Sequence, residues 1–280
     1  MNIENLRAFV EIAATGSFQL AAERLYITQS AISVRIKTLE ERINRKLFLR
    51  RRSGMELTRA GERLLRHAQS CVQSWERAQQ EISLPDDIHN QLTLGIQLNF
   101  WRYIVGPWNH WMDINAPNVA TRIMADDSDK LLNQVRVGNI DVALIYNAKT
   151  ETNLIVESYQ VDRLVLVSTT PRDLNKGWTP GYVFVNWGDE FMVQHRAAFP
   201  DSPLPRLTCR SEDIALNHIL THGGSGYFNL KDIKTMLADK KLHRVKDAPE
   251  FNRESFVVFS KNTPVYESIE LALKGLRKIN

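Results

Sequence analysis

The 280-residue chain contains little cysteine and no long apolar run. Its two cysteines, Cys71 and Cys209, lie far apart in the sequence, which excludes a disulfide-rich scaffold. No apolar stretch approaches the length of a membrane span, and the first residues lack the charged start and apolar core of a secretory signal. We therefore expect a protein of the reducing cytoplasm, with Cys71 as a small core residue rather than a redox sensor.

The common catalytic motifs are also missing. The sequence has no Ser-centred nucleophile elbow and no phosphate-binding loop ending in Gly-Lys-Ser or Gly-Lys-Thr, and the glycines of residues 223–226 lack the spacing of a dinucleotide fingerprint. His218 and His222 are four residues apart, as in some zinc sites, but the Glu of the hydrolytic motif is absent, which favours a surface pair. We expect no enzyme, no catalytic residue, no metal and no cofactor.

The charge of the chain is distributed unevenly. Residues 1–66 hold 13 Lys or Arg against 7 Asp or Glu, whereas the remainder holds 23 against 25. The first segment is therefore +6 and the rest −2. This asymmetry is typical of a polyanion-binding unit joined to a near-neutral domain. With 43% apolar residues, the chain is long enough for two or three modules with sizeable cores.

Residues 17–41 show the pattern of a helix-turn-helix. Ser17 and Thr28 are N-cap residues that each precede a short amphipathic helix, and little room is left between the two helices for a loop. The apolar residues of the second helix recur at i, i+4, i+7 and i+11: Ile32, Ile36, Leu39 and Ile43. Another face of this helix presents Gln29, Ser30, Ser33, Val34 and Lys37. Such amide, hydroxyl and cationic groups suit a major groove, although an ordinary solvated face is the alternative.

A two-stranded wing is expected directly after this pair of helices. Residues 47–49 and 55–57 predict two short strands, and Ser53 with Gly54 predicts the turn between them. The tip of the wing would carry Arg50, Arg51 and Arg52. Three adjacent guanidinium groups repel one another unless anions are near, so we expect them to contact phosphates or a narrow minor groove.

One signature extends over almost all of the first 61 residues: Phe9, residues 17–22, Leu25, residues 29–33, Ile36, Leu39, Glu40, Leu47, Phe48, Arg50 and residues 57–61. It resembles the N-terminal signature of LysR-type bacterial transcriptional regulators. Asn44 replaces the usual Gly and also adopts the left-handed conformation that ends a helix. Val34 stands where Arg is common, so a contact to a thymine methyl would replace a polar one, with Arg35 as a displaced cation. The resemblance implies a regulator whose operator differs from those of better-known members.

A long helix is predicted from Thr58 to about Leu84, where Pro85 stops it. Its apolar residues form a heptad seam: Leu64, Ala68, Cys71, Trp75, Ala78 and Ile82. Pairing with a second copy is the simplest way to bury so narrow a seam, although packing on the chain's own C-terminal domain is the alternative. A homodimer would read an operator with interrupted dyad symmetry. The family resemblance further implies a homotetramer, and RNA polymerase is a candidate partner besides double-stranded DNA.

From Gln91 onward the sequence alternates strands with helices. The first unit has strands at 92–98, 119–125 and 140–146 and helices at 103–114 and 129–137, which predicts a parallel sheet covered on both faces. A second unit has strands at 162–168, 182–187 and 255–260 and helices at 211–222, 230–239 and 264–279. Segments near residues 160 and 262 would join the lobes and leave a cleft between them. This region resembles the regulatory part of LysR-type proteins, similar in fold to periplasmic binding proteins. Around residues 185–188 it resembles a branch with repressors of flagellar operons.

Ligands of open α/β sheets bind beyond the carboxyl ends of the strands. The candidate effector-binding residues at such ends are Gln97, Asn99, Phe100, Trp101, Tyr146, Asn147, Ser168, Thr169, Thr170, Asn186, Trp187 and Asn229. They suit a small polar or aromatic metabolite, although loop caps and core aromatics are the alternative for each residue.

The expected architecture is a multidomain α/β protein. It comprises a winged helix-turn-helix at 1–58, a dimerising linker helix at 59–85 and a two-lobed periplasmic-binding-protein-like domain at 90–280. Lobe I would hold residues 90–160 and 264–280, and lobe II residues 161–263. The predicted function is sequence-specific regulation of transcription, modulated by a small molecule in the cleft. An effector-independent LysR-type repressor with a vestigial cleft is the alternative. A soluble binding protein or a co-regulator, which would show little salt-sensitive retention on DNA, is the rival from another class.

Overall fold

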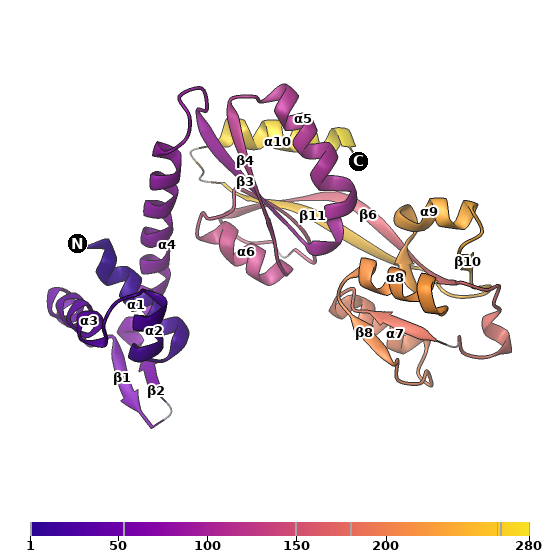
Figure 1. The fold of residues 1–280 in the computed structure, drawn as a ribbon, viewed down its shortest axis with the longest axis horizontal. Coiled ribbons are helices and arrows are strands. Elements are labelled where there is room, and N and C mark those ends of the chain that lie inside the picture. The colour runs from indigo at the N-terminus through magenta and orange to yellow at the C-terminus, as the bar shows by residue number, and fades with distance from the viewer. Residues whose placement is uncertain are drawn as a thin grey trace.

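The computed structural model describes residues 2–52, 54–148, 150–179, 181–261, 263 and 265–279. An N-terminal helical domain is joined by the long helix α4 to a two-lobed α/β region (Figure 1). This architecture confirms the predicted fold class. Three predicted features lie outside the described residues: Ser53 in the wing turn, the crossing point at Asn262 and the start of the last helix at Pro264.

The N-terminal domain packs helices α1 (Ile3–Thr15), α2 (Phe18–Arg24) and α3 (Gln29–Ile43) around one apolar core. The Ser17 hydroxyl accepts from the amide of Leu20, and the Thr28 hydroxyl accepts from the amide of Ala31, so both predicted N-caps are confirmed. Asn44 ends α3 with a φ of 50°, in the left-handed conformation that was expected. A short wing follows, formed by the antiparallel strands β1 (Phe48–Arg51) and β2 (Gly54–Leu57).

A buried carboxylate connects helix α3 to the wing. Glu40 Oε1 accepts from the backbone amide of Leu47 at 2.8 Å, and its Oε2 accepts from Lys46 Nζ at 2.6 Å. Leu47 is itself fully buried at the base of the wing. Glu40 therefore fixes the point at which the wing leaves α3.

Replacing Glu40 by Ala should loosen the wing. The buried amide of Leu47 would lose its acceptor, which costs about 1–3 kcal/mol of local stability. Amide hydrogen exchange over residues 45–58, measured by mass spectrometry, should report this loss as faster exchange. The matched control is Glu41→Ala, because Glu41 is exposed and makes only a 3.9 Å ion pair with Lys37. Equal effects of the two variants would contradict the role assigned to Glu40.

Helix α4 (Arg59–Ile82) begins after its N-cap Thr58 and ends before Pro85. Only part of the predicted seam is exposed. Ala68 is 1% exposed and packs with Leu64 into the N-terminal core, so the expectation that a second copy buries the whole seam is wrong at these two positions. Cys71 is exposed rather than a core residue. Trp75 and Ile82, 47% and 84% exposed, keep large apolar surfaces open.

Lobe I is built on three parallel strands, β3 (Asn90–Ile96), β4 (Val119–Ala125) and β5 (Val142–Tyr146). A π-type turn at Trp101–Val105 leads into α5 (Gly106–Asn115), so this helix begins later than predicted. Helices α5 and α10 (Tyr266–Ile279) pack together against the sheet, and α6 (Ser128–Arg136) packs against β5 and β11. The predicted parallel arrangement of this unit is confirmed.

Lobe II contains strands β7 (Tyr182–Val185), β8 (Leu207–Cys209) and β9 (Ser225–Asn229), with β7 parallel to both neighbours. Its helices are α7 (Asp189–Ala198), α8 (Glu212–His222) and α9 (Leu230–Ala238), and a short strand β10 (His243–Arg244) pairs with β6. Helix α7 and strand β8 had not been predicted.

Two long antiparallel strands, β6 (Leu154–Ser168) and β11 (Phe251–Ser260), run through both lobes. They join the strands of the two lobes into one sheet of order β4-β3-β5-β11-β6-β9-β7-β8, with β10 paired to β6 outside this order. Phe251 packs in the core of lobe II, whereas Val257 and Phe259 pack in the core of lobe I. The predicted lobe boundary at residue 263 is therefore wrong, because the second crossing lies within β11, where the register shifts between Ser255 and Phe256.

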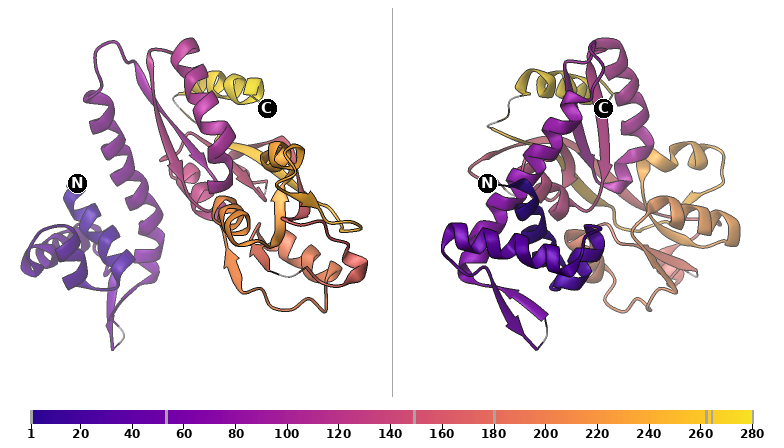
Figure 2. Two further views of the ribbon diagram at one scale, coloured as in Figure 1. Left: turned by 45° about the vertical axis from the view of Figure 1, so that its right-hand side comes forward. Right: turned by 60° about the vertical axis from the view of Figure 1, so that its left-hand side comes forward.

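The N-terminal domain lies at the end of α4 that is remote from the two lobes, and the wing forms the outermost tip of that domain (Figures 1 and 2). Lobe I lies beside the C-terminal half of α4 in these views. Within the described ranges, no helix is long and apolar enough to cross a membrane.

Candidate nucleic-acid interface

The exposed face of α3 carries the residues that sequence analysis assigned to base reading. Gln29, Ser30 and Ser33 are exposed, as are Val34 and Lys37. The Ser33 hydroxyl donates to the carbonyl of Gln29, and the Ser30 hydroxyl lies 2.9 Å from the Thr28 hydroxyl. These local bonds orient both side chains and leave lone pairs on their oxygens for another donor.

A hollow of about 770 Å³ brings this face together with the wing. It is bounded by the starts of α2 and α3 and by both wing strands, and its lining includes Gln29, Ser33, Arg50, Arg51 and Arg52. The predicted recognition helix and the predicted arginine tip thus form one concave surface, which sequence analysis had treated as two separate features. The hollow also includes Gln19, an exposed amide at the start of α2 that had not been predicted as a contact.

A glycine contact holds the wing against the start of α2. The amide of Met55 donates to the carbonyl of Gly16 at 2.8 Å. Gly54 has a φ of 127°, and a Cβ there would lie 2.7 Å from that carbonyl oxygen. Only glycine fits this approach without strain. The position of the arginines therefore depends on a contact between segments about 40 residues apart, which local sequence patterns do not reveal.

Arg35 does not belong to this surface. Its guanidinium pairs with Glu4 of α1 at 3.2 Å and is half-buried. At about 100° per residue, Arg35 lies about 200° around α3 from Ser33, which places it on the far side of the helix. The proposed role of Arg35 as a displaced DNA-contacting cation is therefore wrong. Arg51 makes one exposed ion pair with Glu56 at 3.3 Å, which an incoming phosphate could replace at little cost.

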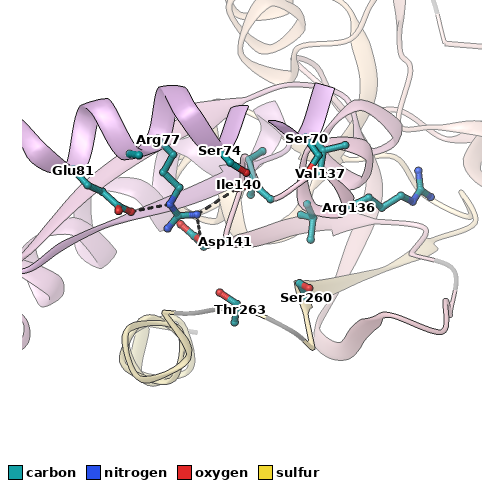
Figure 3. Close-up of a pocket in the computed structure, with 13 residues that line it drawn as sticks. Ser70, Ser74, Arg77, Glu81, Arg136, Val137, Ile140, Asp141, Ser260 and Thr263 are labelled. Carbon is teal, nitrogen blue, oxygen red and sulfur yellow. Dashed lines mark hydrogen bonds and ion pairs between the residues drawn. The ribbon is translucent and has the colours of Figure 1, made fainter. Parts of the chain in front are cut away.

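Helix α4 is fastened to lobe I by Arg77 (Figure 3). The Arg77 guanidinium donates to Asp141 at 2.7 Å and to the carbonyls of Gly138 and Gln91 at 3.3 Å, and it also pairs with Glu81. Asp141 is buried, and its second oxygen accepts from the amide of Thr93 in β3. A neighbouring hollow of about 400 Å³ lies between α4 and this part of the lobe. The linker helix therefore has a defined orientation relative to the regulatory region.

Known proteins share the sequence features of this chain. Residues 3–62 match the family model of the bacterial regulatory helix-turn-helix proteins of the lysR family. The chain is also 26% identical over 274 residues to the HTH-type transcriptional regulator HdfR of Salmonella typhimurium, and the match covers 96% of each protein. This chain belongs to the LysR family. It is a LysR-family DNA-binding transcriptional regulator, and its curated relatives carry the names of regulators rather than of enzymes.

Solved structures share the fold along the whole chain. Vibrio fischeri DarR, solved in complex with DNA, is 18% identical, with a TM-score of 0.63 over 100% of this chain and 98% of that one. ArgP from Mycobacterium tuberculosis is 24% identical, with a TM-score of 0.60 over 98% of this chain and 96% of that one. At these identities, the comparison shows the LysR architecture of a winged domain, a linker helix and a two-lobed regulatory domain.

The regulatory domain brings some of the predicted effector residues together at the junction of the two lobes. Phe100 stacks on Tyr146 with ring centroids 4.5 Å apart, and both are buried. Asn147 faces Gly188 of the opposite lobe. Trp187 is buried and donates to the carbonyl of Tyr227, and Asn186 accepts from the amide of Gly188. Gln97, by contrast, is committed to Ser128 and to the backbone amide of Tyr146.

Three predicted residues lie at the wrong end of the sheet. Ser168 ends β6, and Thr169 and Thr170 follow it. Strand β6 is antiparallel to β9, so Ser168 lies opposite Ser225 at the start of β9. The contacts between the lobes are at the other end, where β9 finishes at Asn229. Thr169 instead exchanges hydrogen bonds with the backbone of Gly224. Their assignment to the effector site is wrong, because it assumed that β6 runs parallel to its neighbours.

The π-type turn of lobe I contacts lobe II through three consecutive side chains. Trp101 donates to Asp213 of α8 at 2.8 Å, and Arg102 pairs with the same carboxylate. The Tyr103 hydroxyl donates to Asp232 at 2.8 Å and accepts from the side-chain amide of Asn229 at 3.2 Å. These contacts hold the two lobes closed. Asn99 makes no contact of this kind among the interactions of the described residues, although it is half-buried beside the turn.

Two acidic side chains, Glu212 and Asp232, lie beside the contacts that Trp101, Arg102 and Tyr103 make with lobe II. Burial and then the neighbouring Asp232 carboxylate raise the pKa of Glu212 well above its ordinary range, and burial raises the pKa of Asp232 as well. Burial also raises the pKa of Tyr103, so its hydroxyl remains a donor at neutral pH. Both shifts favour the neutral form of the carboxyl groups, because burial and the like charge beside each disfavour its ionised form. Neither the acids nor the contacts of Tyr103 were predicted from sequence, and Tyr103 lies 129 residues from Asp232 and 126 residues from Asn229 in the chain.

Proposed function

We propose that this LysR-family regulator reads a specific operator by placing α3 in the major groove and the wing against the adjacent backbone. The observation that carries the proposal is the single concave surface formed by Gln29, Ser33 and the three wing arginines. Amides and hydroxyls at the start of α3 suit base edges, and the arginines suit phosphates or a narrow minor groove. Val34, Ser30 and Lys37 extend the same exposed face.

We infer that two copies bind together, through α4, to an operator with interrupted dyad symmetry. The part of the seam that stays exposed, including Cys71, Trp75 and Ile82, is what supports this inference. The intrachain contacts of α4 with lobe I centre on Arg77, and the hollow beside them is lined by Ser74 and by the seam residue Ala78, whereas Trp75 is not part of its lining. Neighbouring residues on a helix are separated by about 100°, so the seam beside Trp75 remains accessible to a second copy. Assembly of two dimers into a homotetramer follows the expectation from the family.

We further propose that a small molecule in the interlobe cleft modulates this regulator in the cytoplasm, where its bound operator would adjoin sites of RNA polymerase. Ligand binding would change the populations of open and closed lobes and hence the spacing of the paired winged domains. A second candidate is an effector-independent repressor with a vestigial cleft. The strap formed by Trp101, Arg102 and Tyr103 favours it, because the chain closes its own lobes with these side chains.

Genome-wide mapping of bound DNA, followed by titration of the purified protein, tests the proposal. The enriched fragment and a random duplex of equal length should be titrated at several salt concentrations. We expect log Kd to rise linearly with log salt, with a slope of about five if six wing arginines of a dimer each neutralise one phosphate. A protein that shows no preference for the enriched fragment and no salt dependence would instead be a binding protein or a co-regulator.

A further inference from the structure

One buried arginine near the junction of the lobes has two hydrogen-bond donors without a partner among the described residues. Arg253, on β11, is 5% exposed, and its Nε and Nη1 have no hydrogen-bond partner among the residues that the structure describes. Its guanidinium carbon lies 3.3 Å from the ring centroid of Tyr146 and 5.4 Å from that of Trp187. The aromatic rings hold the cation in place without satisfying its donors.

The acid opposite Arg253 already accepts hydrogen bonds from other side chains. Asp162 lies directly opposite Arg253 on β6, but its two oxygens accept from the Tyr146 hydroxyl and from the Gln160 side-chain amide. Burial lowers the pKa of Arg253, although neighbouring groups such as Asp162 oppose that shift. A buried guanidinium with unused donors is expensive to maintain, and such groups in native proteins are normally paired.

The guanidinium lies beside a helix start. Its Nη2 is 3.8 Å from the position that a Cβ would take on Gly188, the residue that precedes α7, and the side-chain amide nitrogen of Asn147 is 3.5 Å from the same point. Gly188 has a φ of 110°, and within the described residues no side chain caps α7. The first amides of a ten-residue helix, a guanidinium fork and a carboxamide therefore converge from both lobes.

We propose that this convergence is an oxyanion subsite, at which the effector presents a carboxylate or phosphate group to Arg253, Asn147 and the start of α7. The inference rests on the proposed effector control and gives the ligand class that it requires. A planar or tetrahedral anion matches the fork of the guanidinium and the positive end of the helix. Since Asn147 belongs to lobe I and Gly188 to lobe II, an anion bound between them joins the lobes. The exposed Asp189 and Glu190 at the start of α7 oppose the positive field there, so the affinity depends on the guanidinium.

Thermal unfolding of the full-length protein tests the subsite without DNA. Sodium acetate and sodium phosphate are titrated separately against sodium chloride at constant ionic strength, so that the two arms distinguish a carboxylate from a phosphate ligand. We expect the melting temperature of the parent to rise with saturation in at least one arm. Arg253→Lys should weaken that anion about tenfold or more, because a bidentate fork is lost while the charge is retained.

A second variant covers the case in which Arg253→Lys does not fold. Asn147 is exposed and has a φ of 57°, which Asp also tolerates, so Asn147→Asp should fold normally and repel the anion. The matched control is Arg206→Lys at an exposed position of lobe II, which should respond as the parent does. A linear salt response that is identical in all four proteins would overturn the subsite. DNA binding of the same samples is measured in parallel, so that loss of the anion response can be separated from failure of the proposed function.

Discussion

The double variant Arg51→Ala, Arg52→Ala is expected to bind every duplex more weakly, by roughly ten- to a hundred-fold at moderate salt. Both guanidinium groups line the hollow beside the recognition helix, where a phosphate backbone would lie. Each lost phosphate contact should also lower the slope of log Kd against log salt by about 0.9. Fluorescence anisotropy with the mapped operator and with a random duplex, at three or more salt concentrations, measures both quantities.

Variants of α3 should behave differently. Gln29→Ala and Ser33→Ala are expected to weaken operator binding by about 1–3 kcal/mol each while leaving random DNA almost unaffected, because base contacts distinguish sequences and phosphate contacts do not. The matched control for charge is Arg172→Ala, Arg206→Ala, which removes two exposed cations of the regulatory domain. If that control weakens DNA binding as much as the wing variant does, the effect arises from net charge and the interface is misplaced.

The sequence predicted those features that depend on neighbouring residues. The caps at Ser17 and Thr28 and the left-handed Asn44 each depend on a few adjacent backbone groups, and they are found as expected. Arg35 was misassigned because its partner Glu4 is on another helix. The periodicity of a helix predicts which of its faces is buried, but it does not predict which acid of another helix lies beside a cation on the remaining surface.

Contacts between distant segments also determine where the side chains of the regulatory domain lie, and local sequence patterns did not predict them. Ser168 was misplaced because the direction of β6 is decided by its pairing with β9, about 60 residues later. Arg253 was overlooked because it precedes the strand predicted at 255–260, and its environment of Tyr146 and Trp187 comes from distant segments. Alternation along one strand predicts which side chains share a face, and it does not predict what the opposite lobe places against them.

The largest effect should come from a single charge on the linker helix. Trp75→Glu is expected to convert the dimer to a monomer at micromolar concentration, because Trp75 is the largest apolar side chain on the exposed part of the seam. Operator binding should then weaken by a hundred-fold or more, since two linked winged domains bind far more tightly than one. Sedimentation velocity measures the mass of the particle, and anisotropy with a whole operator and a half-site measures the lost advantage of pairing.

Gln80→Glu is the matched control for this prediction. Gln80 is exposed and lies about 140° around α4 from Trp75. Its side-chain oxygen accepts from the Arg122 guanidinium of lobe I in the same chain at 3.2 Å, an interaction that Glu would retain. This variant should remain dimeric and keep full operator affinity, although it introduces the same negative charge. If Trp75→Glu also stays dimeric, pairing does not use this seam, and the exposed ring would have to serve another contact. If the variant is monomeric yet binds the whole operator as the parent does, one winged domain suffices for recognition and the dyad operator is wrong.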